Sequence, residues 1–182
     1  MMLDYDAEAD TYDATRGGLP RAQAAASAVA ALLPPAAQRV ADVGAGTGIV
    51  SAELARRGLD VVCVDQSAGM LRHAVARLPG SCLRAGGDRL PLRTASVDAV
   101  TFVWLLHLVP DAGPLLAEAR RVVNPGGRIV TTVDKRGLGR ATDAYDLVVA
   151  QSGLAPVAET TFVGMGQGCG DPDPVYRVVA LG

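Results

Sequence analysis

Apolar segments of two kinds alternate along the chain. Short apolar runs of strand length are followed by longer runs in which apolar residues recur at helical spacing, and glycine, proline or polar residues separate the two kinds. The pattern predicts strands at residues 39–43, 60–65, 81–85, 97–104, 128–133, 157–163 and 175–181. It predicts helices at residues 22–33, 49–57, 68–78, 112–123 and 141–151.

The order of these elements indicates the fold class. Strands alternate with helices until the last two strands, which have no helix between them. This order predicts an α/β protein with a doubly wound, seven-stranded, mostly parallel sheet, in which a C-terminal hairpin supplies one antiparallel strand. Ser67 and Asp111 are expected to cap the third and fourth helices, and Asn-Pro-Gly-Gly at 124–127 is expected to form a turn before the fifth strand.

The composition agrees with one folded domain. The chain has 182 residues, and its 49% hydrophobic content favours a folded globule, so we expect a single domain with an N-terminal helical cap segment (1–37) and a core (38–182). A net charge of −2 provides no reason to expect nucleic acid as a partner. No apolar run reaches the roughly 18 residues of a membrane span, and the N-terminal residues are acidic, so we expect no membrane insertion and a cytoplasmic location.

The three cysteines do not form a metal-binding pattern. Cys63, Cys82 and Cys169 lack the spacing of metal ligands. Cys63 and Cys82 stand in apolar runs, where a cysteine behaves as a small hydrophobic residue. We therefore expect both to be buried thiols, and no metal site is predicted.

Three glycines follow the first predicted strand, in the stretch VADVGAGTGIV (40–50). Gly44, Gly46 and Gly48 permit positive φ angles and let a ligand approach the backbone closely. In an open α/β sheet, ligands bind beyond the carboxyl ends of the strands, where this loop lies. The spacing departs from the dinucleotide pattern G-x-G-x-x-G, because position 49 is isoleucine. The loop therefore predicts a ligand of another kind.

The stretch from Asp42 to Gly48 resembles the D-x-G-x-G-x-G signature of class I S-adenosylmethionine-dependent methyltransferases. The resemblance implies a Rossmann-like fold and S-adenosylmethionine as the cofactor, with S-adenosylhomocysteine as the product. It also implies that the loop with Gly44, Ala45 and Gly46 wraps the amino-acid end of the cofactor. Asp42 would then contribute to holding the amino group of the cofactor.

Two acidic residues match later positions of the family. Asp65 ends the second predicted strand, where a carboxylate can accept hydrogen bonds from both ribose hydroxyls. The segment GGDRLPLRTASVDAV (86–100) resembles the family segment in which Gly-Asp precedes Leu-Pro, which implies that Asp88 faces the adenine amino group with the backbone of Arg89 beside it. The stretch 118–130 resembles the family's E-x-x-RVLKPGG stretch, which has a structural role.

The N-terminal stretch YDAEADTYDATRGG (5–18) is similar to the opening of the ubiquinone and menaquinone C-methyltransferases, which act on small molecules. This similarity implies a small-molecule acceptor. Beside the residues named above, we expect Tyr12, Arg16, Gln66, Met70 and Trp104 to bind the cofactor.

Aromatic residues and a histidine are candidates for the acceptor side. Tyr5, Tyr12 and Trp104 can line the pocket, because aromatic faces are favourable near a sulfonium. His107 lies just past the fourth strand, where an imidazole can take a proton at neutral pH. Two roles remain open for it: a general base, or a substrate-binding residue without a catalytic duty.

The chain lacks a long insertion that would cover the pocket. The gaps after the fourth and fifth strands are short, so the roof has three candidate sources: the N-terminal segment, a partner subunit in a homodimer, or the substrate itself. We expect the sixth strand to run parallel to the others, which brings the long loop 164–174 to the pocket rim, with Met165 or Gln167 touching substrate. A simple hairpin turn is the alternative for this loop.

Three functions remain open from the sequence. The first is methyl transfer from S-adenosylmethionine to a small-molecule acceptor. The second is a cyclase or isomerase that binds the same cofactor without methylating, and the third is a non-catalytic binding protein. The intact glycine loop, Asp65 and Asp88 argue against the third function but do not separate the first two.

Overall fold

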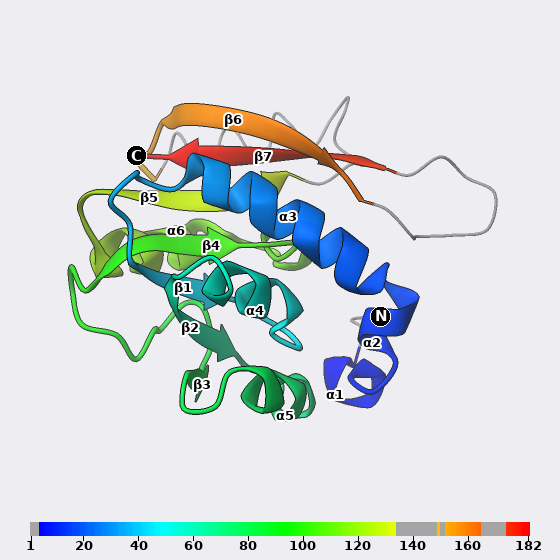
Figure 1. Cartoon of the computed structure of the whole chain (residues 1–182). Coiled ribbons are helices and arrows are strands. Elements are labelled where there is room, and N and C mark those ends of the chain that lie inside the picture. The colour runs from blue at the N-terminus through cyan, green and yellow to red at the C-terminus, as the bar shows by residue number, and fades with distance from the viewer. Residues whose placement is uncertain (1–3, 134–148, 150–151, 165–173) are drawn as a thin grey trace.

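Seven strands form one sheet in the computed structural model, which describes residues 4–133, 149, 152–164 and 174–182 (Figure 1). The strands are β1 (Arg39–Val43), β2 (Asp60–Asp65), β3 (Cys82–Arg84), β4 (Val97–Phe102), β5 (Val123–Val133), β6 (Pro156–Val163) and β7 (Val175–Leu181). Their spatial order is β3-β2-β1-β4-β5-β7-β6. Because β7 is antiparallel to both of its neighbours, β6 runs parallel to the first five strands. The predicted fold class is confirmed.

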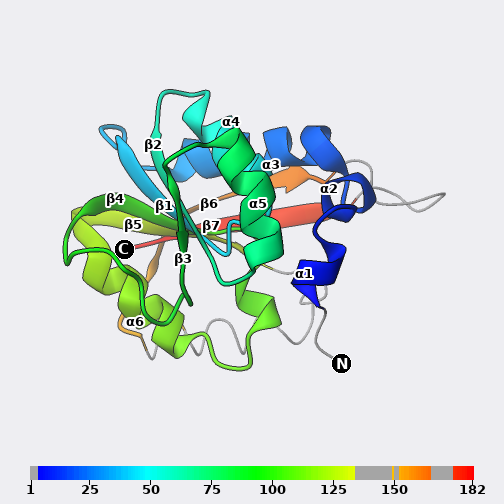
Figure 2. The same cartoon turned by 90° about the horizontal axis from the view of Figure 1, so that it is seen from below.

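Helices cover both faces of this sheet. The helices of the described residues are α1 (Tyr5–Glu8), α2 (Tyr12–Thr15), α3 (Gly18–Leu32), α4 (Ile49–Ala55), α5 (Ala68–Arg77), the short 3-10 helix η1 (Leu106–Leu108) and α6 (Gly113–Val122). α3 and α4 pack on one face, with α5 beside α4, and α6 packs on the other (Figure 2). α1 and α2 lie on the side toward which the arrows of β1, β2 and β4 point (Figure 1).

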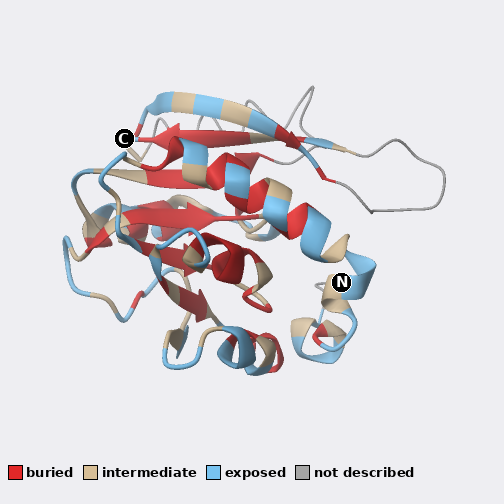
Figure 3. Cartoon of the chain, in the orientation of Figure 1, coloured by how far each residue is buried: buried red, intermediate tan, exposed pale blue. Residues whose placement is uncertain are grey.

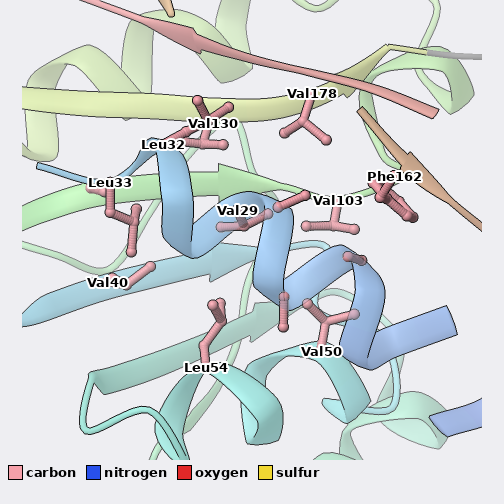
Figure 4. Packing of buried hydrophobic residues seen from close by; sticks show 14 of the residues in the cluster. Val29, Leu32, Leu33, Val40, Val50, Leu54, Val103, Val130, Phe162 and Val178 are labelled. Carbon is pink, nitrogen blue, oxygen red and sulfur yellow. The ribbon is translucent and has the colours of Figure 1, made fainter. Parts of the chain in front are cut away.

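Buried aliphatic side chains hold the helices to the sheet. α3 places Val29 and Leu32 against Val40, Val130 and Val178 of three strands (Figure 4). All five side chains are 5% exposed or less, and burying a side chain of this size contributes roughly 1.5–3 kcal/mol. The central strands are buried, whereas the edge strand β6 also carries exposed positions, as Figure 3 shows.

The predicted turn at 124–127 is part of β5. Val97 of β4 pairs with Val123, and the next paired residues are Ala99 and Arg128, so the residues between them form an irregularity within the strand. Gly126 has φ +82°, as the third residue of a type II turn requires, so the predicted turn is present but lies inside β5, because strand pairing continues on both sides of it. Turn-forming residues serve here as a bulge.

Other boundaries shift by a few residues. β4 ends at Phe102 rather than at Trp104, because Trp104 has φ +56°, outside the extended region. α6 begins at Gly113, and Asp111 precedes the N-cap residue, although its carboxylate accepts a hydrogen bond from the Gly113 N–H at 2.8 Å. α3 starts four residues before the predicted position. The predicted helix at 141–151 lies almost entirely outside the described residues.

The two described cysteines occupy paired positions on β2 and β3. Cys63 is buried as predicted, whereas Cys82 is only half-buried, because β3 lies at the edge of the sheet. Within the described ranges, no three His, Cys, Asp or Glu side chains gather in a way that would hold a metal ion. In the same part of the chain, none of the helices combines the length and apolar character that crossing a bilayer requires.

Candidate active site

A cavity of about 350 Å³ opens at the carboxyl ends of β1, β2 and β4. Its walls come from the glycine loop after β1, the end of β2, the loop between β3 and β4, the segment after β4, and the N-terminal helices. Polar side chains line the cavity after β2 (Asp65, Gln66 and Ser67) and after β3 (Asp88), whereas the lining residues after β4 are mainly apolar. The cavity therefore lies where a doubly wound sheet offers its ligand site.

The glycine loop adopts backbone conformations that favour glycine. Gly44, Gly46 and Gly48 have φ angles of +70°, +56° and +72°. The N–H groups of Gly44 and Ala45 donate to the carbonyl of Val64 at 2.8 and 3.1 Å, which holds the loop to β2. Gly44 and Gly46 line the cavity, whereas Gly48 packs against α5. The loop therefore needs glycine for its φ angles along its length, and only its first part faces a ligand.

Asp42 lies beneath this loop and is not among the residues that line the cavity. Its side chain is buried and accepts hydrogen bonds from Ser51 Oγ at 2.5 Å and from Thr101 Oγ1 at 2.7 Å. Burial raises the pKa of the Asp42 carboxyl above its ordinary value, against the effect of the two hydroxyl donors. In this arrangement Asp42 links β1 to α4 and β4. Its position beneath the loop does not bring it into direct contact with a ligand in the cavity.

The raised pKa of Asp42 leads to a prediction about stability. The folded protein holds the Asp42 proton more tightly than the unfolded chain, so this group lowers stability as pH rises above the unfolded pKa of about 3.9. We therefore expect the stability of Asp42→Asn relative to the wild type to rise as pH rises from about 4 toward the folded-state pKa of Asp42. Urea unfolding of both proteins across this range measures the difference. A relative stability that falls with rising pH would contradict the assignment.

Asp65 links the loop to the start of α5 and also faces the cavity. Its two carboxylate oxygens accept hydrogen bonds from the N–H groups of Gly46 and Ser67, each at 2.8 Å. Gln66, Ser67 and Met70 line the cavity beside it. The structure thus brings Asp65, Gln66 and Met70 together around one cavity, as the sequence predicted.

Asp88 lines the cavity from the loop that follows β3. Gly86 and Gly87 line it as well, and a side chain on Gly87 would approach Val43 within 3.0 Å. Arg89 is exposed and does not line the cavity, although its N–H donates to the carbonyl of Gly86 at 3.3 Å and closes a turn around Asp88. The carboxylate of Asp88 is therefore presented by a tight turn.

The N-terminal segment covers the cavity. Tyr5 and Tyr12 both line it, with ring centroids 6.2 Å apart. Burial raises the pKa of both phenols, so their hydroxyl groups stay protonated at neutral pH. Arg16 does not line the cavity, and its guanidinium lies 5.7 Å from the centre of the Tyr12 ring. Of the three predicted sources for the roof, the N-terminal segment occupies this position.

Each of the two tyrosines is followed by an aspartate that anchors the segment. Asp6 accepts hydrogen bonds from Ser67 Oγ at 2.6 Å and from the Gly69 N–H at 2.7 Å. Asp13 accepts from Thr47 Oγ1 and from Arg77 Nη2, both at 2.6 Å. The roof is therefore fastened to the glycine loop and to α5 by hydrogen bonds to both aspartates, of which Asp13 is half-buried and Asp6 is exposed.

Trp104 belongs to an aromatic cluster around a buried arginine. The Arg21 guanidinium lies 3.6 Å from the centre of the Trp104 ring and donates to the Tyr176 hydroxyl at 3.1 Å. Phe162 and Tyr176 contact the edge or face of the Trp104 ring. Trp104 lines the cavity, so this cluster supports one wall. Sequence reasoning missed Arg21, because an arginine in an alanine-rich helix carries no local sign of partners far along the chain.

The predicted acceptor-side residues differ in their placement. His107 lies in η1, is exposed, and is absent from the described residues that line the cavity, whereas its neighbours Leu105 and Leu108 line it. Met165 and Gln167 lie outside the described residues. The contribution of these three residues stays a prediction.

The glycine loop, Asp65 and Asp88 around one cavity define a cofactor-binding protein of the doubly wound α/β class. Comparison with known families identifies it further. The chain belongs to the methyltransferase domain family, whose model matches residues 41–131, half of the chain. The resemblance to class I S-adenosylmethionine-dependent methyltransferases is thereby confirmed, and S-adenosylmethionine is the cofactor of this family.

Individual relatives agree with this assignment. The chain is 39% identical over 130 residues to an uncharacterized methyltransferase of Mycobacterium tuberculosis. The alignment covers 71% of this chain and 51% of that protein. It is 46% identical over 94 residues to a demethylmenaquinone methyltransferase of Beutenbergia cavernae, covering 51% of this chain and 39% of that protein. The chain thus spans about half the length, or less, of these curated relatives.

A solved structure shares the whole fold. The structure of a SAM-dependent methyltransferase from Thermotoga maritima, described as a possible histamine N-methyltransferase, superposes with a TM-score of 0.75. The alignment covers 97% of this chain and 96% of that chain at 20% identity. Similarity at this level of identity establishes the fold and leaves the substrate open.

Proposed function

We propose that the chain transfers a methyl group from S-adenosylmethionine to a small-molecule acceptor. The observation that carries the proposal is a single cavity in which the glycine loop, Asp65 and Asp88 meet the apolar residues that follow β4. Cofactor and acceptor can therefore share one space. The cavity volume of about 350 Å³ and the net charge of −2 favour a small acceptor over nucleic acid.

The residues around the cavity fit S-adenosylmethionine. Asp65 offers carboxylate oxygens for ribose hydroxyls, and Asp88 offers them for the adenine amino group. Gly44 lets the Leu105 side chain pack against the loop at the cavity wall, because a Cβ on residue 44 would lie 2.8 Å from that side chain. Gln66 would contribute to the nucleoside end. When bound, the cofactor supplies an electrophilic methyl group on a positively charged sulfur.

Side chains of the roof and of the wall after β4 orient the acceptor and keep water out. Tyr5 and Tyr12 present protonated hydroxyls that can donate hydrogen bonds to an acceptor oxygen, and Trp104 offers an aromatic surface. Holding reactants in a reactive geometry can supply up to roughly 7–11 kcal/mol in model systems, so positioning can account for much of the rate. A general-base role for His107 stays a prediction.

The apolar wall favours an acceptor with an apolar or aromatic body. Leu105, Leu108, Val109 and Pro110 line this part of the cavity. One relative is a demethylmenaquinone methyltransferase, so quinols and phenols are the first acceptors to test. A cytoplasmic location and a homodimer stay predictions from the sequence.

Mass spectrometry tests the proposed activity. The purified chain is incubated with S-adenosylmethionine that carries a deuterated methyl group and with a panel of quinols and phenols. We expect one acceptor to gain a single labelled methyl group, with S-adenosylhomocysteine formed in equal amount. Cofactor binding with no transfer to any acceptor would favour the cyclase or isomerase function, and no cofactor binding would contradict the proposal.

A further inference from the structure

The loop at 85–96, between β3 and β4, contains no helix or strand yet presents Asp88 to the cavity. Residues in such a loop need contacts that determine where their side chains lie. α6 supplies these contacts through Glu118 and Arg121. Both residues belong to the stretch 118–130, for which the sequence indicated only a structural role. The two side chains lie one helical turn apart.

Glu118 and Arg121 hold the loop backbone next to Asp88. Glu118 Oε2 accepts a hydrogen bond from the Leu90 N–H at 2.8 Å, and Arg121 Nη2 donates to the Leu90 carbonyl at 3.1 Å. Both polar groups of the Leu90 backbone are thus bound by this pair. Arg121 Nη1 also donates to the carbonyl of Leu92 at 3.0 Å.

The pair is itself rigid. Arg121 Nε donates to Glu118 Oε1 at 2.7 Å, and Arg121 Nη2 donates to Glu118 Oε2 at 2.8 Å. Two parallel bonds between a guanidinium and a carboxylate determine orientation as well as distance. The hydrogen bonds with Arg121 lower the pKa of Glu118 to about 2, so the pair stays charged at physiological pH.

The far end of the loop is held to the same helix. The N–H of Ala95 donates to the Arg121 carbonyl at 3.0 Å, and the N–H of Ser96 donates to the Val122 carbonyl at 2.7 Å. The side chain of Leu90 is buried, which fixes the loop from a third direction. α6 therefore sets the path of the loop from Leu90 to Ser96.

We propose that Glu118 and Arg121 are positioning residues that hold Asp88 where it binds the adenine amino group of the cofactor. The inference rests on the proposed function, because it requires Asp88 to bind adenine. Asp88 lies two residues before Leu90, and the turn between Gly86 and Arg89 transmits the position of Leu90 to the carboxylate. Loss of the pair would free this turn without altering the glycine loop.

Calorimetry with two ligands tests this inference. S-Adenosylhomocysteine carries the adenine amino group, and S-inosylhomocysteine carries an oxygen in its place. We expect the wild type to prefer the adenosyl ligand by roughly 10- to 100-fold, because a hydrogen bond to a charged group is lost in the other. In Glu118→Gln, we expect adenosyl affinity to fall by roughly 2- to 30-fold, inosyl affinity to change little, and the preference to shrink.

Matched variants separate positioning from general stability. Glu159→Gln makes the same change in an ion pair on β6 and β7, where Glu159 accepts from Arg177 Nε at 2.9 Å, and it should leave the ligand preference unchanged. Arg121→Lys is the second variant if Glu118→Gln does not fold, and it should reduce the preference in the same direction. Adding Glu118→Gln to Asp88→Ala should have little further effect on the preference.

Several outcomes would overturn the inference. Equal losses of affinity for both ligands in Glu118→Gln would show that the pair only stabilises the fold. An unchanged preference in that variant would have the same meaning. If Asp88→Ala keeps the wild-type preference, both the role of Asp88 and this inference fail, whereas a wild-type chain that binds neither ligand would contradict the proposed function itself.

Discussion

Asp65→Ala is expected to raise the dissociation constant for S-adenosylhomocysteine by roughly 10²- to 10⁴-fold, because it removes two hydrogen bonds to a charged group that are worth about 1.5–3 kcal/mol each. The same carboxylate also accepts from the N–H groups of Gly46 and Ser67. The substitution therefore loosens the glycine loop in addition to removing ligand contacts. Isothermal titration calorimetry measures the change.

Asp60→Ala is the matched control for this prediction. Asp60 begins the strand that Asp65 ends, and it forms an exposed ion pair with Arg39 at 3.0 Å. Exposed pairs of this kind contribute little, so we expect less than about a twofold change in affinity. Equal affinity of Asp65→Ala and the wild type would remove Asp65 from the cofactor site.

Gly48→Ala is expected to destabilise the fold by roughly 2–5 kcal/mol. Two effects add: a left-handed conformation costs an L-residue about 1–2 kcal/mol, and overpacking costs about 1–3 kcal/mol. Gly48 has φ +72°, and a Cβ there would lie 2.9 Å from the Cβ of Ala74 and 3.0 Å from its Cα. α4 and α5 must therefore separate to admit one methyl group.

Gly58→Ala isolates the backbone part of this effect. Gly58 has φ +90°, but a Cβ there meets nothing within 4 Å, so we expect a loss of only about 1–2 kcal/mol. Denaturant unfolding of the wild type and both variants gives the two free energies of unfolding. Equal losses of unfolding free energy in the two variants would show that contact with Ala74 does not add to the cost of a side chain at position 48.

The sequence predicted the cofactor side of the site more completely than the acceptor side. The ends of β1 and β2 are as predicted, so Asp65 lies at a strand end and faces the cavity. Apolar periodicity and glycine positions determine backbone structure over a few neighbouring residues, and a sequence pattern shows features on that scale. The acceptor side depends on the roof and on the segment after β4, whose side-chain directions follow from packing. His107 illustrates this, because its neighbours Leu105 and Leu108 line the cavity and it does not.

The sequence by itself determined the order of strands and helices, the position of the glycine loop and the acidic residues at strand ends, because these features depend on local periodicity and backbone preference. Only the tertiary structure decided which side of the loop Asp42 occupies, and that Arg21 supports Trp104. It also brought Glu118 to the backbone of Leu90, 28 positions away. The physical reason is that strand order and helix packing determine which distant residues a side chain contacts. Neither can be read from the residues next to it in the sequence.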